Sequence, residues 1–278
     1  AAALTQSEYE SIGVTGFSTT AERAAAEVTV LNELISSFSD NTKVDRINEV
    51  VDIRKAVTAL IDTVEGKTPA ITKSQLGLLG FAVDAAGVTT DVTDDNLSAI
   101  RKVLADTGIG TDFDTVDTLA KVQTLVNGAI TALEAVKTEA DADDGDAITV
   151  AQLEAMGVEG AVDTGTDANI ALINSILDGT VASIDANTLE KVQKLVDVAA
   201  KAVDLAGDAS AAKLTQAELT LMGITGVNSA TKLALVNDLL VADSTAQAAL
   251  SDIQAFADVA AKLITNLELA SDATFTDS

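Results

Sequence analysis

The sequence contains no cysteine, no histidine and no tryptophan, and it has one proline and one tyrosine among 278 residues. Without cysteine there are no disulfides and no thiolate chemistry, and the usual Cys/His zinc sites are excluded as well. The lack of histidine excludes imidazole acid–base catalysis. The chain also lacks a GxGxxG fingerprint, a P-loop and a GxSxG motif. No spacing among its acidic residues singles out a catalytic pair. We therefore expect a protein that is not an enzyme.

Positive charge is also scarce, because 17 Lys and Arg residues face 43 Asp and Glu residues and leave a net charge of −26. Such a field repels phosphate groups, so we expect neither nucleic acid nor an anionic membrane surface as a partner. No run approaches the roughly 20 apolar residues that span a bilayer, so we expect no membrane insertion. Hydrophobic residues still make up 47% of the chain, which is enough for a folded core.

Four stretches of the sequence align with one another and read LTQSEYESIGVTG, ITKSQLGLLGFAV, ITVAQLEAMGVEG and LTQAELTLMGITG. Each has Glu or Gln three residues after Thr, which is the spacing of a capping box at the start of a helix. A glycine follows about two turns later, where a left-handed residue commonly ends a helix. The pattern predicts four short helices that begin after Thr5, Thr72, Thr149 and Thr215 and end before Gly13, Gly80, Gly157 and Gly223.

Two longer helical patterns follow each of these stretches. The second is marked by VLNELI, AIRKVL, LINSIL and LVNDLL, and the third is an apolar stripe at 3–4 spacing in which Ile47, Val122, Val192 and Ile253 share one register. We predict an all-α fold of about twelve main helices, arranged as four tandem three-helix-bundle repeats with the boundaries 1–68, 69–146, 147–210 and 211–278. The repeats either stack into an elongated helical array or follow one another as beads. The extra residues from Val83 to Asp95 predict a surface loop.

Polar residues recur at fixed places in the two longer helices. Three of the four second helices have Asn at one position, namely Asn32, Asn174 and Asn237, where the second repeat has Arg101. We interpret these asparagines as the polar edge of a buried stripe. The third helices have Gln or Asn followed four residues later by Asp or Asn, as in Gln193 and Asp197. A solvated helix face and a binding site explain these third-helix positions equally well.

An acidic linker between the second and third repeats is the strongest candidate metal site. If Ile148 is position eight of an EF-hand loop, Asp141 and Asp143 take positions one and three and Gln152 takes position twelve. The match is imperfect, because position five lacks a side-chain ligand and Asp146 replaces the turn glycine. The alternative is a linker that runs into a capping box, since Asp is favourable at a helix N-terminus anyway. The candidate Ca²⁺ ligands are Asp141, Asp143, Asp144, Asp146 and Gln152, and we expect no other cofactor.

The repeat pattern LTxxELxxMGITGV, LxxVNxxL and LxxIQxxVDxAxK resembles the tandem helical repeats of large bacterial surface and biofilm adhesins. Its three-helix outline is also similar to the albumin-binding GA modules of bacterial cell-wall proteins. The resemblance extends over all four repeats and implies extracellular display in tandem arrays, with spacer, assembly or adhesive roles. It carries neither a ligand nor binding residues over to this chain.

Three functions fit these observations. The first is a non-enzymatic structural segment of an extracellular bacterial assembly, such as an adhesin stalk, a filament or a surface-layer component, whose partners are other copies of itself or neighbouring surface-protein domains. The second is a module that binds a host or matrix protein. The third is a spacer that stiffens with calcium. Proteins from salty habitats are also this acidic, so an intracellular protein of such an organism is a further alternative to the cell surface.

Overall fold

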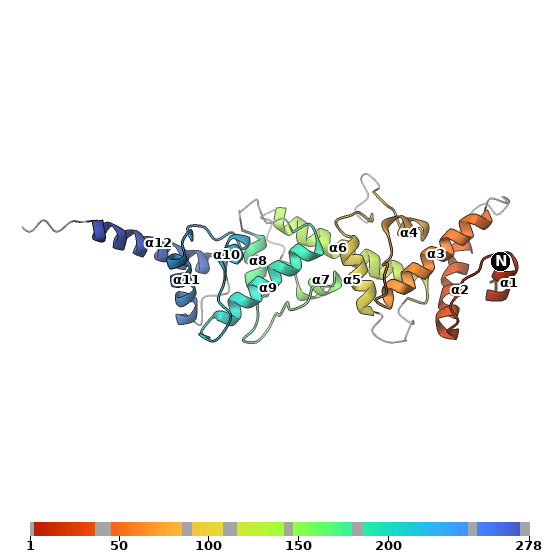
Figure 1. Ribbon diagram of the computed structural model, residues 1–278, viewed down its shortest axis with the longest axis horizontal. Coiled ribbons are helices and arrows are strands. Elements are labelled where there is room, and N and C mark those ends of the chain that lie inside the picture. Colours follow the sequence, from red (N-terminus) through yellow and green to blue (C-terminus); the bar gives the residue numbers. More distant parts are fainter. Residues whose placement is uncertain are drawn as a thin grey trace, which may run out of the picture. The chain divides into compact units, whose positions relative to one another are not determined.

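The computed structural model describes residues 3–36, 46–84, 91–107, 116–141, 147–179, 186–243 and 249–272. Within these ranges the chain forms twelve α-helices and no strand, apart from an isolated bridge between Val83 and Val92 (Figure 1). The prediction of an all-α fold is therefore confirmed. The number of repeats, their boundaries and their stacking stay predictions, and we call the stretches 1–68, 69–146, 147–210 and 211–278 segments 1 to 4.

Each segment contains one short helix followed by two longer ones. The short helices are α1 (Gln6–Ser11), α4 (Lys73–Leu78), α7 (Val150–Ala155) and α10 (Gln216–Leu221). The second helices are α2 (Ala21–Ser36), α5 (Leu97–Thr107), α8 (Ile170–Leu177) and α11 (Ala230–Ala242). The third helices are α3 (Arg46–Val64), α6 (Leu119–Asp141), α9 (Leu189–Leu205) and α12 (Leu250–Asp272). None of the helices that the structure describes is both long enough and apolar enough to cross a membrane.

The short helices begin as the capping pattern predicts. In all four, the Thr hydroxyl accepts a hydrogen bond from the backbone N–H three residues later, at 3.2–3.3 Å. The Glu or Gln at that position accepts a bond from the Thr N–H in return, at 2.6–2.9 Å. Both donors would otherwise lack a partner inside the helix, so the reciprocal bonds fix where each helix begins.

The short helices also end as predicted, at a glycine in the left-handed region. Gly13, Gly80, Gly157 and Gly223 have φ values between 84° and 90°. The residue after each glycine donates its N–H to a carbonyl five residues back, as Val14 does to Tyr9 at 3.0 Å and Ile224 does to Leu219 at 2.9 Å. This bond defines a Schellman ending, in which glycine avoids the steric cost of a Cβ atom.

The chain divides into two compact units. Unit 1 comprises residues 1–134 with 155–157, and unit 2 comprises residues 135–154 with 158–278. In unit 1, α3 packs against α2 of its own segment and against α4 and α5 of segment 2. In unit 2, α9 packs against α8 of its own segment and against α11 of segment 4, while α12 contacts α11 and α8. In each unit, therefore, the third helix of the first segment also contacts the following segment.

The extra residues of segment 2 are only partly described. Val92, which is buried, donates its N–H to the carbonyl of Ala82 at 2.8 Å, and Asp84 donates its N–H to the carbonyl of Val92 at 3.2 Å. The side chain of buried Asn96 accepts a bond from the N–H of Thr93 and donates one to the carbonyl of Asp91, both at 2.9 Å. The described ends of the predicted surface loop are thus held against the segment, and residues 85–90 lie outside the described part.

Candidate functional site

The recurrent asparagine of the second helix binds the backbone at the start of the short helix. The N–H of Ile148 donates to Asn174 Oδ1 at 2.8 Å, and Asn174 Nδ2 donates to the carbonyl of Ile148 at 3.0 Å. We call this pair of hydrogen bonds between one side-chain amide and the backbone of one residue an amide clamp. It satisfies the backbone groups of the residue before the capping Thr in the way that a neighbouring strand would. The asparagine therefore attaches the short helix to the second helix.

The same amide clamp occurs in segments 1 and 4. Asn32 exchanges two bonds of 2.9 Å with the backbone of Leu4, and Asn237 exchanges bonds of 2.8 and 3.0 Å with Leu214. Asn32 Oδ1 also accepts a bond from the Tyr9 hydroxyl at 2.9 Å. Burial raises the pKa of Tyr9 to about 12, so its phenol stays protonated and remains a donor near neutral pH. The polar edge that the sequence predicts is thus a set of structural bonds.

Segment 2 replaces the clamp with side chains from two helices. Arg101 Nε of α5 donates to the carbonyl of Ile71 at 2.7 Å, and the N–H of Ile71 donates to Thr63 Oγ1 of α3 at 2.7 Å. Thr63 and Ile71 are both buried. Because Thr63 belongs to segment 1 and Ile71 to segment 2, this bond joins the two segments directly.

The recurrent glutamine of the third helix binds the backbone at the other end of the short helix. Gln193 exchanges two bonds of 2.9 Å with the backbone of Glu159, and Gln254 exchanges bonds of 2.9 and 3.3 Å with Thr225. Each glutamine also donates to the Asp four residues later, at 2.7 Å for Asp197 and at 2.9 Å for the corresponding residue of α12. The Gln–Asp pairs are therefore structural, which the sequence alone left undecided.

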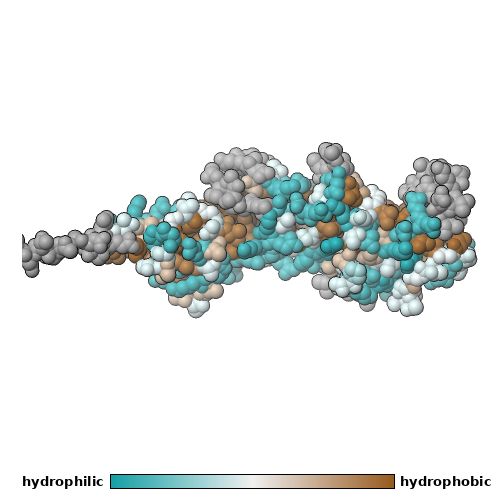
Figure 2. All heavy atoms as spheres, turned by 45° about the horizontal axis from the view of Figure 1, so that its top comes forward, coloured by the Kyte–Doolittle hydropathy of each residue, from teal (hydrophilic) through white to brown (hydrophobic). Residues whose placement is uncertain are grey.

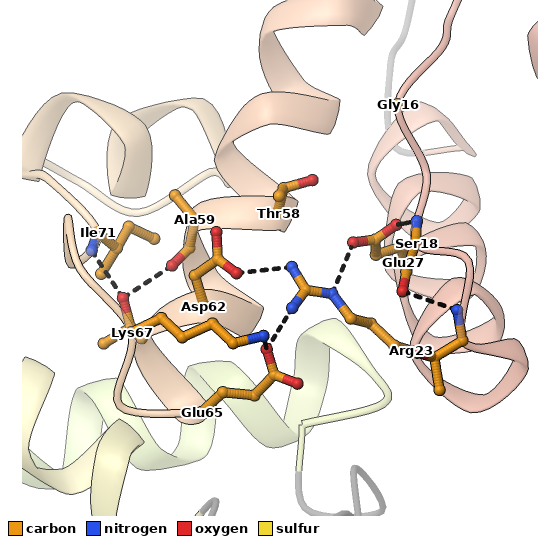
Figure 3. Close-up of polar contacts among 12 residues, drawn as sticks. Gly16, Ser18, Arg23, Glu27, Thr58, Ala59, Asp62, Glu65, Lys67 and Ile71 are labelled. Atoms are coloured by element: carbon orange, nitrogen blue, oxygen red, sulfur yellow. Dashed lines mark hydrogen bonds and ion pairs between the residues drawn. The ribbon is translucent and has the colours of Figure 1, made fainter.

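A network of charges around Arg23 was missed by the sequence analysis. Arg23 of α2 binds Glu27 at 3.2 Å, Asp62 at 2.7 Å and also Glu65 (Figure 3). Glu27, whose side chain is almost fully buried, accepts a further bond from the N–H of Ser18 at 3.0 Å. The i, i+4 spacing of Arg23 and Glu27 was the one available signal. The network ties the start of α2 to the end of α3, so it also has a structural role.

One position of the second helix caps the third helix of the following segment. The residue after Asn32 is Glu33, whose carboxylate accepts a bond from the N–H of Leu119 at 2.6 Å. The residue after Asn174 is Ser175, whose hydroxyl accepts a bond from the N–H of Leu250 at 2.8 Å. Both N–H groups lie in the first turn of a helix, where no intrahelical partner exists. The same contact thus joins segment 1 to segment 2 and segment 3 to segment 4.

The predicted calcium ligands lie mostly outside the described residues. Asp143, Asp144 and Asp146 are not described, and Asp141 is described only as the last residue of α6. The side-chain oxygen of Gln152 accepts bonds from the N–H and the hydroxyl of Thr149, at 2.9 and 2.8 Å. Gln152 would have to exchange or share these bonds to bind an ion. In the ranges that the structure describes, no three His, Cys, Asp or Glu residues form a group that could hold a metal.

No protein-family model, curated protein or solved structure matches the chain. The function must therefore be inferred from the bonds and surfaces described above. Those bonds show one consistent use, because the clamping asparagines, Gln193, Gln254, Glu33 and Ser175 satisfy backbone groups beside the short helices or at the start of the next third helix. We find no catalytic arrangement among them.

Proposed function

We propose that the chain is a non-enzymatic structural component of an extracellular bacterial surface assembly, such as an adhesin stalk, a filament or a surface-layer component. One observation carries the proposal. The recurrent asparagine and glutamine side chains hold the helices within a segment together, and the residue after the asparagine joins one segment to the next. A chain built in this way is suited to extension by further segments, which is the architecture of helical repeat proteins.

The charge of the protein supports the same proposal. A net charge of −26 keeps an exposed array soluble and disfavours non-specific binding to anionic surfaces. The lack of cysteine also suits a protein that folds outside the cell without oxidative steps. The resemblance of the sequence pattern to surface and biofilm adhesins gives the proposed location.

Immunolabelling of the cells that produce the protein tests the proposed location. Antibodies raised against the purified chain are expected to label intact cells, and brief protease treatment of those cells should remove the label. Antibodies against a cytoplasmic protein of the same cells serve as the control and should label permeabilised cells only. If the chain is detected only after permeabilisation, the proposed surface role is wrong.

A protein-binding module is the second candidate function, and one observation favours it. Large apolar side chains are exposed at Leu4 and Ile12 in segment 1 and at Val259, Leu263 and Leu267 in α12. Contiguous apolar patches on a soluble protein often mark interaction sites. Serum albumin is the first probe, because the three-helix outline is similar to GA modules. Albumin binding that is lost in Leu263→Lys, measured by biolayer interferometry, would favour the binding module over the structural role.

A further inference from the structure

The third helix of segment 4 exposes an apolar stripe. Val259, Leu263 and Leu267 are 50%, 45% and 57% exposed. Their spacing of four residues places them on one face of α12. Hydrophobic side chains are visible at the surface over the C-terminal half of α12 (Figure 2). Among the described residues of the other third helices, no large apolar side chain is exposed to this degree.

The corresponding positions are mostly buried in α3 and α9, which pack against the next segment. In the register that aligns Ile253 with Ile47 and Val192, the α12 stripe corresponds to Ile53, Val57 and Ile61 of α3. These three are at most 1% exposed, and Val198 and Ala202 of α9 are at most 4% exposed. The helix α3 packs against α4 and α5, and α9 packs against α11. A following segment therefore accounts for the burial that α12 lacks.

The apolar residues on either side of the short helix α1 are also more exposed than their counterparts in other segments. Leu4 is 37% and Ile12 is 46% exposed. The residues at the same positions of segments 2 and 4 are buried, namely Ile71 and Leu79, and Leu214 and Met222. In those two segments the preceding third helix reaches the short helix, since α3 packs against α4 and Lys201 of α9 binds Glu218 of α10. Segment 1 thus exposes the surface that a preceding third helix covers elsewhere.

The charges at the two ends also match an internal junction. Lys201 Nζ binds both oxygens of Glu218, at 2.8 Å each. In the same register Lys201 corresponds to Lys262 of α12, and Glu218 corresponds to Glu8 of α1. Lys262 and Glu8 are both exposed. Glu8 is held in the same capping box as Glu218, so its carboxylate has the orientation that the internal junction uses.

We infer that α12 of one molecule docks on segment 1 of a second copy of this chain, head to tail, with the stripe Val259–Leu263–Leu267 against Leu4 and Ile12 and with Lys262 paired to Glu8. The contact repeats the junction between segments 3 and 4. We call the surface around Leu4 and Ile12 the head and the α12 stripe the tail. Because head and tail differ, a docked pair leaves one of each free, and the assembly grows as an open chain. The inference rests on the proposed structural role and specifies its partner and its register.

Sedimentation equilibrium with end-blocked variants tests this docking. Ile12→Lys blocks the head and Leu263→Lys blocks the tail, and both changes are made at exposed positions, so circular dichroism should show unaltered helix content. The wild-type weight-average mass is expected to rise with concentration beyond twice the 28.3 kDa of one chain. Each variant alone should stay monomeric over the same range. Leu78→Lys, at an exposed leucine of segment 2, is the matched control and should associate like the wild type.

A mixture of the two blocked variants gives the decisive result. Ile12→Lys keeps an intact tail and Leu263→Lys keeps an intact head, so an equimolar mixture should form a 1:1 dimer and nothing larger. Lys262→Gln should weaken wild-type association by no more than about fivefold, the equivalent of one exposed ion pair. A monomeric wild type, a mixture that stays monomeric, or dimers formed by one blocked variant alone would each overturn head-to-tail docking.

The docking result and the labelling result can fail separately. If the protein associates as expected but is absent from the cell surface, the head-to-tail docking stands and the proposed location is wrong. If the protein lies at the surface but stays monomeric with both ends intact, the location stands and the docking is wrong.

Discussion

Segments 1 and 4 make the same bonds but bury them to different depths. Both have a capping box, a Schellman ending and an amide clamp of nearly equal length. In segment 4 the clamped residue, Leu214, is 2% exposed, whereas in segment 1 Leu4 is 37% exposed. Since the local bonds match, the difference reflects the neighbour, because segment 3 precedes segment 4. The local bonds are therefore set within each segment, and packing between segments decides how deeply they are buried.

Removal of the amide clamp should give the largest difference in stability loss between segments 4 and 1. Asn237→Leu leaves the buried N–H and carbonyl of Leu214 without partners and should lower the free energy of unfolding by about 3 kcal/mol. Asn32→Leu, made in a Tyr9→Phe background so that no phenol is orphaned, should cost less than about 1 kcal/mol, because water reaches Leu4. Chemical denaturation measures both. Equal losses at the two sites would mean that burial does not set the strength of the clamp.

The junction between segments 1 and 2 offers the next largest effect. Thr63→Val removes the acceptor for the buried N–H of Ile71 while keeping the shape of the side chain, and it should cost about 2 kcal/mol. Thr29→Val is the matched control, since both hydroxyls also bond the carbonyl four residues back and Thr29 is exposed. The control should change stability by less than about 0.5 kcal/mol. A loss of the same size in both variants would refute a special role for the junction bond.

Loss of the helix caps should have a smaller effect. Thr215→Ala and Thr149→Ala should each cost roughly 0.5–2 kcal/mol, the usual range for an N-cap. Thr5→Ala should fall at the low end of that range, because α1 is the most exposed of the four short helices at its apolar positions. Denaturation curves for the three variants give the order. No loss at either Thr215 or Thr149 would be inconsistent with helices that begin there.

Calcium should have the smallest specific effect. Salt of any kind should raise the melting temperature, because screening weakens the self-repulsion of a −26 charge. If residues 141–152 bind calcium, millimolar calcium should stabilise the protein more than sodium chloride at matched ionic strength. The difference should vanish in Asp141→Ala with Asp143→Ala. If the double variant keeps the whole calcium effect, the linker is not the site.

The sequence predicts the short helices well because their signals are local. A capping box and its terminating glycine lie within nine residues of each other, as Thr215 and Gly223 do. The amide clamps were out of reach, because Asn174 binds a residue 26 positions away and the polar position alone does not name its partner. The cap from Glu33 to Leu119 extends over 86 positions. Such long-range bonds depend on how helices pack, which periodicity does not specify.

Hydrogen exchange at two amides tests whether packing against a neighbouring segment sets how well each amide clamp is covered. The N–H groups of Leu4 and Leu214 make equivalent bonds to Asn32 and Asn237, so their exchange rates report how well each clamp is covered. We expect the Leu214 amide to exchange slowly at every protein concentration. The Leu4 amide should exchange quickly in dilute solution and slow toward the Leu214 rate as the protein associates, but not in Leu263→Lys. A Leu4 rate that stays constant while the mass rises would contradict the account.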